Sequence, residues 1–154
     1  MASQSLHLNE IITGELRFSL CIPVETPSNN TLKGLHFHTY KNMRRQWRME
    51  VLVALKGARP LKPIGRAFLR ITRECAGGGL DWDNAYGGLK PLLDCLVAPS
   101  SKNPDGLGLI EDDNPKNMPF PPLVKQVAGK RGKGSTILEI FELDDMLCSA
   151  SPKF

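Results

Sequence analysis

A stretch without glycine or proline, from Thr39 to Lys56, constrains the fold of this 154-residue chain more than any other feature. Apolar residues recur within it at steps of three and four, namely Tyr40, Met43, Trp47, Val51 and Ala54. On a helix this spacing places the apolar side chains on one face. The sequence therefore predicts an amphipathic helix that ends at Gly57. Its polar face carries Lys41, Arg44, Arg45 and Arg48.

Several segments carry the patterns of β-strands. Leu16–Ile22 alternates apolar and polar residues, and Arg66–Arg73 predicts a strand with a basic face. Residues 80–84 predict a short extended segment. Near the C-terminus, 122–127 and 136–143 predict two more strands. The glycine-rich basic linker between these two indicates a hairpin.

A second helix is predicted from Gly88 to Ala98, because leucines recur there with helical spacing and Pro91 falls in the first turn, where proline is tolerated. The order of predicted elements indicates an α+β fold, a mixed β-sheet with two main helices packed on one face. We expect one domain over residues 16–143, preceded by an N-terminal extension (1–15) and followed by a C-terminal tail (144–154).

The composition, 41% hydrophobic and 23% charged, is that of a soluble globular protein. No apolar run approaches the roughly 18 residues of a membrane span, and the first residues lack the features of a secretory signal. We therefore expect a cytoplasmic protein without membrane contact. The four cysteines form no Cys-x-x-Cys pair, so we expect mostly buried, reduced thiols.

Charge is distributed unevenly along the chain. Residues 33–73 hold eleven basic side chains against Glu50 alone, and residues 74–114 hold eight acidic side chains against two lysines. Basic side chains gather the phosphates of a nucleic acid, and clustered carboxylates hold divalent cations. Charge runs also serve simply as solvated surface. The distribution fits an enzyme that acts on a polyanion.

The acidic block contains the motif Asp81-Trp82-Asp83-Asn84. If this segment is extended, the two aspartates point to one side and Trp82 to the other, so we expect Trp82 in the core, with a stacking wedge as the alternative. The two carboxylates repel each other unless a cation lies between them. A third carboxylate from Asp112 or Asp113 would complete a Mg²⁺ site. The residues that follow exclude an EF-hand, since its glycine and glutamate are absent.

The ordered set of motifs resembles the RusA family of Holliday junction resolvases. In that family an Asp-x-Asp-Asn motif precedes a helix that carries Lys and, four residues on, Asp, and an Asp-Asp pair follows later. The matching residues here are Asp81, Asp83, Asn84, Lys90, Asp94, Asp112 and Asp113. Pro27–Asn30 and the basic, tryptophan-containing helix are similar to the N-terminal half of phage and prophage members. The resemblance covers roughly residues 16–143.

The resemblance implies a homodimeric, Mg²⁺-dependent endonuclease, with Mn²⁺ as a substitute ion, that nicks branched DNA at four-way junctions. It implies that Asp81, Asp83 and Asp113 are catalytic metal ligands, that Asp112 is a ligand or supports one, and that Lys90 neutralises charge on the scissile phosphate. The distance from Asp83 to Lys90 is longer than in compact members, so Gly87 and Gly88 belong to an insertion.

The candidate DNA contacts are basic residues of the helix, of the second strand and of the glycine-rich linker: Arg44, Arg45, Arg48, Arg66, Arg70, Lys130, Arg131 and Lys133. Two other functions stay open. One is a non-catalytic nucleic-acid-binding module whose acidic block serves a partner, and the other is a flap or single-strand nuclease with the same carboxylates. The expected setting is the cytoplasm of a bacterial cell, with phage, prophage and host origins all open.

Overall fold

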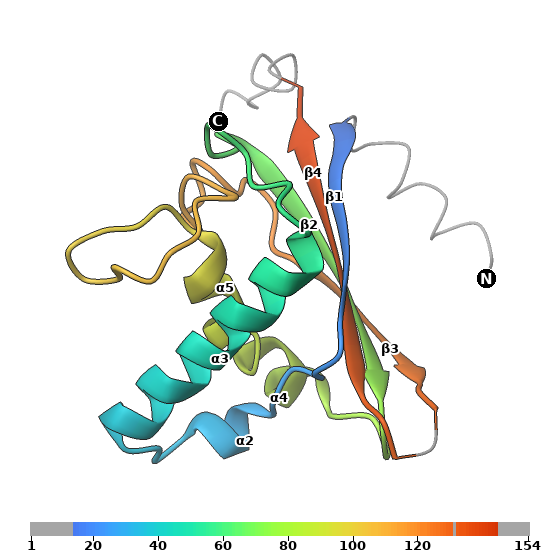
Figure 1. Ribbon diagram of the computed structural model, residues 1–154. Helices are drawn as coiled ribbons and strands as arrows, with labels where there is room; N and C mark the ends of the chain where they lie inside the picture. The colour runs from blue at the N-terminus through green and yellow to red at the C-terminus, as the bar shows by residue number, and fades with distance from the viewer. Residues whose placement is uncertain (1–13, 131, 145–154) are drawn as a thin grey trace, which may run out of the picture.

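A four-stranded mixed sheet forms one layer of the protein, and the helices lie together on one of its faces (Figure 1). The computed structural model describes residues 14–130 and 132–144. The predicted α+β fold is confirmed. In chain order the elements are β1 (Gly14–Ile22), α2 (Asn29–Leu32), α3 (Phe37–Leu55), β2 (Ala67–Cys75), α4 (Trp82–Gly87), α5 (Lys90–Leu96), β3 (Leu123–Ala128) and β4 (Ser135–Leu143).

The strands lie in the order β1-β4-β2-β3, so the predicted hairpin between β3 and β4 is wrong. β2 lies between them, antiparallel to β4 and parallel to β3. A parallel neighbour needs a long crossover, which α4, α5 and the following loop provide. The linker after β3 passes the end of β2, where the Gly129 amide donates to the Cys75 carbonyl at 2.8 Å. The apolar β2 thereby becomes a central strand.

The predicted long helix is confirmed as α3, which packs its apolar stripe against the core through Trp47, Val51 and Leu55. Lys56 ends the helix with a left-handed backbone (φ 50°), and Gly57 follows with φ 83°. α5 is shorter than predicted, and Pro91 lies in its first turn. Helices α3 and α5 cover the same face of the sheet (Figure 1), and within residues 14–130 and 132–144 no helix covers the other face.

The extended segment predicted at residues 80–84 is wrong, because α4 begins there instead. Asp81 is the N-cap residue with φ −62° and ψ 158°, and Asp83 lies in the first turn. The Asp81 side chain makes no cap hydrogen bond, so the favourable feature at this helix start is Asp83, whose charge suits the positive end of the helix. Trp82 is 58% exposed, so its expected place in the core is also wrong.

The structure bears on the expectations for the cysteines and for membrane-spanning helices. Cys75 and Cys95 are buried free thiols, whereas Cys21 is exposed. Cys148, like nearly all of the predicted N-terminal extension and C-terminal tail, lies outside the described residues. In residues 14–130 and 132–144, none of the helices combines the length and apolar character needed to cross a membrane.

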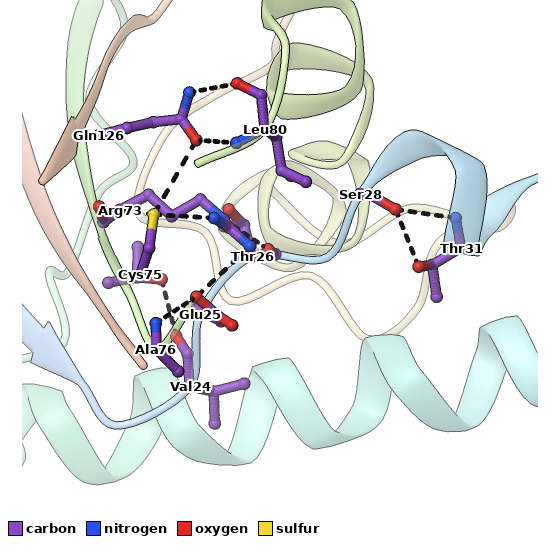
Figure 2. A network of polar contacts seen from close by, with 11 residues as sticks. Val24, Glu25, Thr26, Ser28, Thr31, Arg73, Cys75, Ala76, Leu80 and Gln126 are labelled. Carbon is purple, nitrogen blue, oxygen red and sulfur yellow. Dashed lines mark hydrogen bonds and ion pairs between the residues drawn. The ribbon is translucent and has the colours of Figure 1, made fainter. Parts of the chain in front are cut away.

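A buried arginine connects the segment after β1 to the end of β2 (Figure 2). Arg73 is only 6% exposed, and its side chain points to the helical side of the sheet together with Cys75. Its Nε donates to the Thr26 carbonyl at 3.0 Å, and Nη1 donates to Cys75 Sγ at 2.9 Å. Nη2 lies 3.4 Å from the Glu25 carboxylate. The guanidinium thus fixes the path of residues 24–26.

A second contact in the same region fixes the start of α4 (Figure 2). The Gln126 side chain of β3 accepts from the Leu80 amide at 2.8 Å and donates to the Leu80 carbonyl at 2.7 Å. The Gln126 side chain thus satisfies both backbone groups of Leu80, much as a neighbouring strand would. It thereby fixes the position of Leu80, the residue immediately before Asp81.

Replacing Arg73 with lysine keeps the charge but removes the planar set of donors that reaches Thr26, Cys75 and Glu25 together. Arg73→Lys should lower the free energy of unfolding by about 1–3 kcal/mol, measured by urea denaturation. Arg45→Lys, at an exposed position of α3, is the matched control and should change little. Equal stability of the Arg73→Lys and wild-type proteins would contradict this account.

Candidate functional site

The first part of the candidate site is the N-terminus of α4. Asp81 and Asp83 are both exposed there, one as the cap and one in the first turn. The Asn84 side-chain amide donates to Asp81 Oδ1 at 2.5 Å. The partial positive charge of a helix N-terminus stabilises carboxylates within its first turn. This local structure presents two exposed carboxylates at the start of one short helix.

The Pro27–Asn30 segment docks directly on α4, although it lies more than fifty positions away in the sequence. The Asn30 amide donates to Asn84 Oδ1 at 3.0 Å. A Cβ atom on Gly88 would lie 1.7 Å from the Pro27 carbonyl oxygen, and one on Gly87 would lie 2.4 Å from Asn29 Cγ. The two glycines, predicted to belong to an insertion, thus let the α4–α5 junction approach this segment.

The second part of the site is a polar group between α3 and α5. Asp94 accepts from the Tyr40 hydroxyl at 2.7 Å and from Lys90 Nζ at 3.2 Å. Burial, and next the hydrogen bond to Asp94, raise the pKa of Tyr40. The spacing of the sequence predicts Tyr40 on the apolar stripe of its helix and does not reveal that its hydroxyl reaches Asp94 of α5. The Lys90 side chain stays 67% exposed, so a ligand can reach its ammonium group.

The third part of the site is the Asp112–Asp113 pair. The Asp112 carboxylate accepts from the Asp113 amide and from the Asn114 side chain, both at 2.8 Å. Burial raises the pKa of Asp113, as do a hydrogen bond with Asp112 and the charges of Asp112 and Asp94. Asp113 also lines an apolar hollow of about 380 Å³ with Leu93 and Phe120. Asp112 is therefore engaged locally, and Asp113 is the better candidate ligand of the two.

Contacts in the described residues join some of the predicted site residues, namely Lys90 with Asp94 and Asp112 with Asp113. After burial and the contact with Asp112, the charge of Asp94 also raises the pKa of Asp113. Across residues 14–130 and 132–144, no hydrogen bond joins Asp81 or Asp83 to Asp112 or Asp113. The same residues contain no group of three His, Cys, Asp or Glu side chains placed to hold a metal ion. The convergence of three carboxylates on one ion therefore stays a prediction.

Several of the predicted DNA-binding arginines have partners within the protein. Arg44 pairs with the Asp105 carboxylate at 3.3 Å, and Arg48 Nε donates to the Asp105 carbonyl at 3.0 Å. These contacts hold the loop after α5 against α3. Arg66 donates to the Asp144 carbonyl at 3.2 Å.

Arg70 lies on the sheet face that carries no helices and forms two hydrogen bonds with Glu139, at 2.5 and 2.8 Å. The hydrogen bonds from Arg70 lower the pKa of Glu139, as expected for a close ion pair. Its guanidinium also lies over the Phe141 ring, 5.2 Å from the centroid. Arg70 is therefore already partnered, and a phosphate would compete with Glu139 for it.

Arg45, Lys130 and Lys133 are exposed, and Arg131 lies outside the described residues. The two lysines line a hollow of about 860 Å³ beyond the ends of β2 and β3, together with the glycines of the linker. In the described part of the chain none of these three cations forms an ion pair, so they are the most accessible of the predicted phosphate contacts.

Comparison with protein-family models gave no match for this chain, and comparison with curated proteins gave none either. The resemblance to the RusA family therefore rests on the ordered residues of the motifs. In the structure, segments 27–30 and 84–88, which are far apart in the sequence, are in direct contact.

Adding one methyl group at Gly88 should disturb the docking of the Pro27 segment. The Gly88 backbone (φ −73°) suits any residue, so the effect of Gly88→Ala comes from the clash with the Pro27 carbonyl. We expect a loss of about 1–3 kcal/mol in urea unfolding. Gly78→Ala is the control, because nothing lies within 4 Å of the added Cβ there. Equal changes in the free energy of unfolding for the two variants would show that the close contact between Gly88 and Pro27 does not affect stability.

Removing the charge of Asp113 should stabilise the metal-free protein. The pKa of Asp113 is higher in the folded protein than in the unfolded chain. The free energy of unfolding therefore falls as the pH rises from below the unfolded-state pKa to above the folded-state pKa. Asp113→Asn should therefore raise the melting temperature at pH 7, and the gain should vanish at low pH, where the carboxyl is protonated in both states. Thermal denaturation across this range tests the sign. Glu111→Gln, at an exposed neighbouring position, should show no such gain.

Proposed function

We propose that this protein is a Mg²⁺-dependent endonuclease that nicks branched DNA at four-way junctions. The main support for the proposal is that motifs far apart in the sequence contact each other on the helical side of the sheet. Segment 27–30 contacts residues 84–88. After burial and the contact with Asp112, the charge of Asp94, on α5, is one of the causes that raise the pKa of Asp113. The residues that carry the resemblance to the RusA family thus lie on connected elements.

The chemistry of the candidate ligands suits Mg²⁺, which binds carboxylate and phosphate oxygens and water. Proteins commonly supply only one or two carboxylates to Mg²⁺, and the substrate phosphate and water complete its shell. A preassembled group of three acids is therefore not required before DNA binds. The bound ion would lower the pKa of a water molecule and stabilise charge on the phosphate. The proposed ligands are Asp81, Asp83 and Asp113, with Asp112 supporting Asp113, and Mn²⁺ as a substitute ion.

The other residues of the site have roles that follow from their contacts. Lys90 presents an exposed ammonium group that can neutralise charge developing on the phosphate. Asp94, one turn further along α5, pairs with Lys90, and the Tyr40 hydroxyl of α3 donates to the same carboxylate. Repulsion between Asp113 and its acidic neighbours favours cation binding at this place, since a divalent ion removes the repulsion.

The proposal includes a homodimer, because paired symmetrical nicks require two active sites. It includes phosphate contacts by the exposed Arg45, Lys130 and Lys133, supported by Arg44, Arg48, Arg66, Arg70 and Arg131. Such contacts make binding depend strongly on salt concentration. The proposed setting is the bacterial cytoplasm.

Replacing one proposed ligand should separate DNA binding from cleavage. We expect the wild-type protein to nick a synthetic four-way junction in Mg²⁺ or Mn²⁺. Asp83→Asn should bind the junction with similar affinity and cut it at least about 100-fold more slowly, as when a group that stabilises the transition state is removed. Glu15→Gln, an exposed change at the start of β1, is the control for a lost carboxylate. Cleavage by Asp83→Asn at the wild-type rate would exclude the mechanism.

The same material distinguishes the alternative functions. Junction binding without cleavage in either ion, together with no Mg²⁺ binding by calorimetry, would indicate a non-catalytic nucleic-acid-binding module. Cleavage of flaps or single strands at rates above that of the junction would indicate a different nuclease specificity with the same carboxylates. A linear duplex provides the reference for both comparisons.

A further inference from the structure

We infer that Trp82 and Tyr86 form a stacking platform for an unpaired nucleobase at the branch point of DNA, an inference that rests on the proposed nuclease function. The two aromatic residues lie one helical turn apart on α4 and are 58% and 40% exposed. Their ring centroids are 6.3 Å apart and the planes are inclined by 52°. The rings therefore do not stack face to face on each other, and ring surface stays available to a ligand.

Contacts of Tyr86, Ala85 and Asn84 anchor α4, the helix that carries the platform. The Tyr86 hydroxyl accepts from the Val124 amide of β3 at 3.4 Å, which ties the ring to the sheet. Ala85 is fully buried beneath the helix. Asn84 binds the Asn30 amide on the opposite side of α4. A rigid aromatic surface loses little entropy when a base stacks on it, so the exposed rings are suited to binding.

The neighbours of Trp82 favour a nucleobase over a protein partner. Its neighbours in the sequence, Asp81 and Asp83, are both exposed. The cores of protein interfaces are depleted of charged residues, whereas a base needs only one exposed ring face. The carboxylates repel phosphates in the absence of a divalent cation, so stacking should require Mg²⁺ or Ca²⁺. Such a base would lie beside the proposed metal ligands, where the strand is to be cut.

The two tryptophans make this inference directly measurable, because Trp47 is 3% exposed and Trp82 is 58% exposed. The difference in fluorescence between wild type and Trp82→Phe reports Trp82 alone, without any change in the core. We expect this difference signal to be quenched when the protein binds, in Ca²⁺, a four-way junction or a duplex with two unpaired thymines. A fully paired duplex should quench it less.

Affinity measurements on variants complete the test. Trp82→Leu should weaken binding of the thymine-containing duplex by roughly 10-fold or more, since base stacking on aromatic residues contributes strongly to affinity. Trp82→Phe should stay within a few-fold of wild type, because a smaller aromatic ring remains. Val53→Ala, which shortens another exposed apolar side chain on α3, is the control and should bind normally.

The outcomes separate this inference from the proposed function. Junction nicking by the wild type, with no quenching and with normal binding by Trp82→Leu, would overturn the platform and leave the nuclease intact. Quenching by the thymine-containing duplex without nicking of any substrate would support the platform and remove the nuclease. If Trp82→Leu instead dissociates a dimer in sedimentation experiments while DNA affinity stays normal, the surface binds protein and the inference fails.

Discussion

The buried guanidinium of Arg73 is the contact on which the arrangement of the candidate site depends. It holds residues 24–26 against the end of β2, and the chain then continues into the Pro27–Asn30 segment. That segment docks on α4 through Asn84 and the two glycines of the α4–α5 junction. An arginine can hold three partners in this way because its donors lie in one plane with fixed directions. The motifs of the N-terminal and central parts of the chain meet as a consequence.

The carboxylates illustrate a conflict between stability and binding. Asp81 and Asp83 gain stability from the helix N-terminus, whereas Asp113 lies near Asp112 and Asp94 and is partly removed from water. Crowded like charges lower the stability of a protein without a ligand and favour a cation when one is present. A carboxyl whose pKa is raised in this way is a candidate for a functional position.

The aromatic residues of α4 show how the choice between helix and extended chain at residues 80–84 changes the role expected of Trp82. An extended segment would have directed Trp82 away from the aspartates and into the core. In the helix, Trp82 lies between them at the surface and near Tyr86. The sequence contains two competing signals, alternation over five residues and acidic residues where a helix can begin, and the local pattern does not decide between them.

The sequence by itself determined the elements with strong periodicity. Helix α3, strands β1, β2 and β4, the α+β class and the helical face of the sheet follow from apolar residues repeated over many positions, whose burial energies add. Tertiary structure alone decided the place of β2 between β3 and β4, the docking of Pro27 on Gly88, and the bond from Tyr40 to Asp94. These features depend on contacts between distant segments, which become favourable only after the sheet and its helices are in place, so no local pattern encodes them.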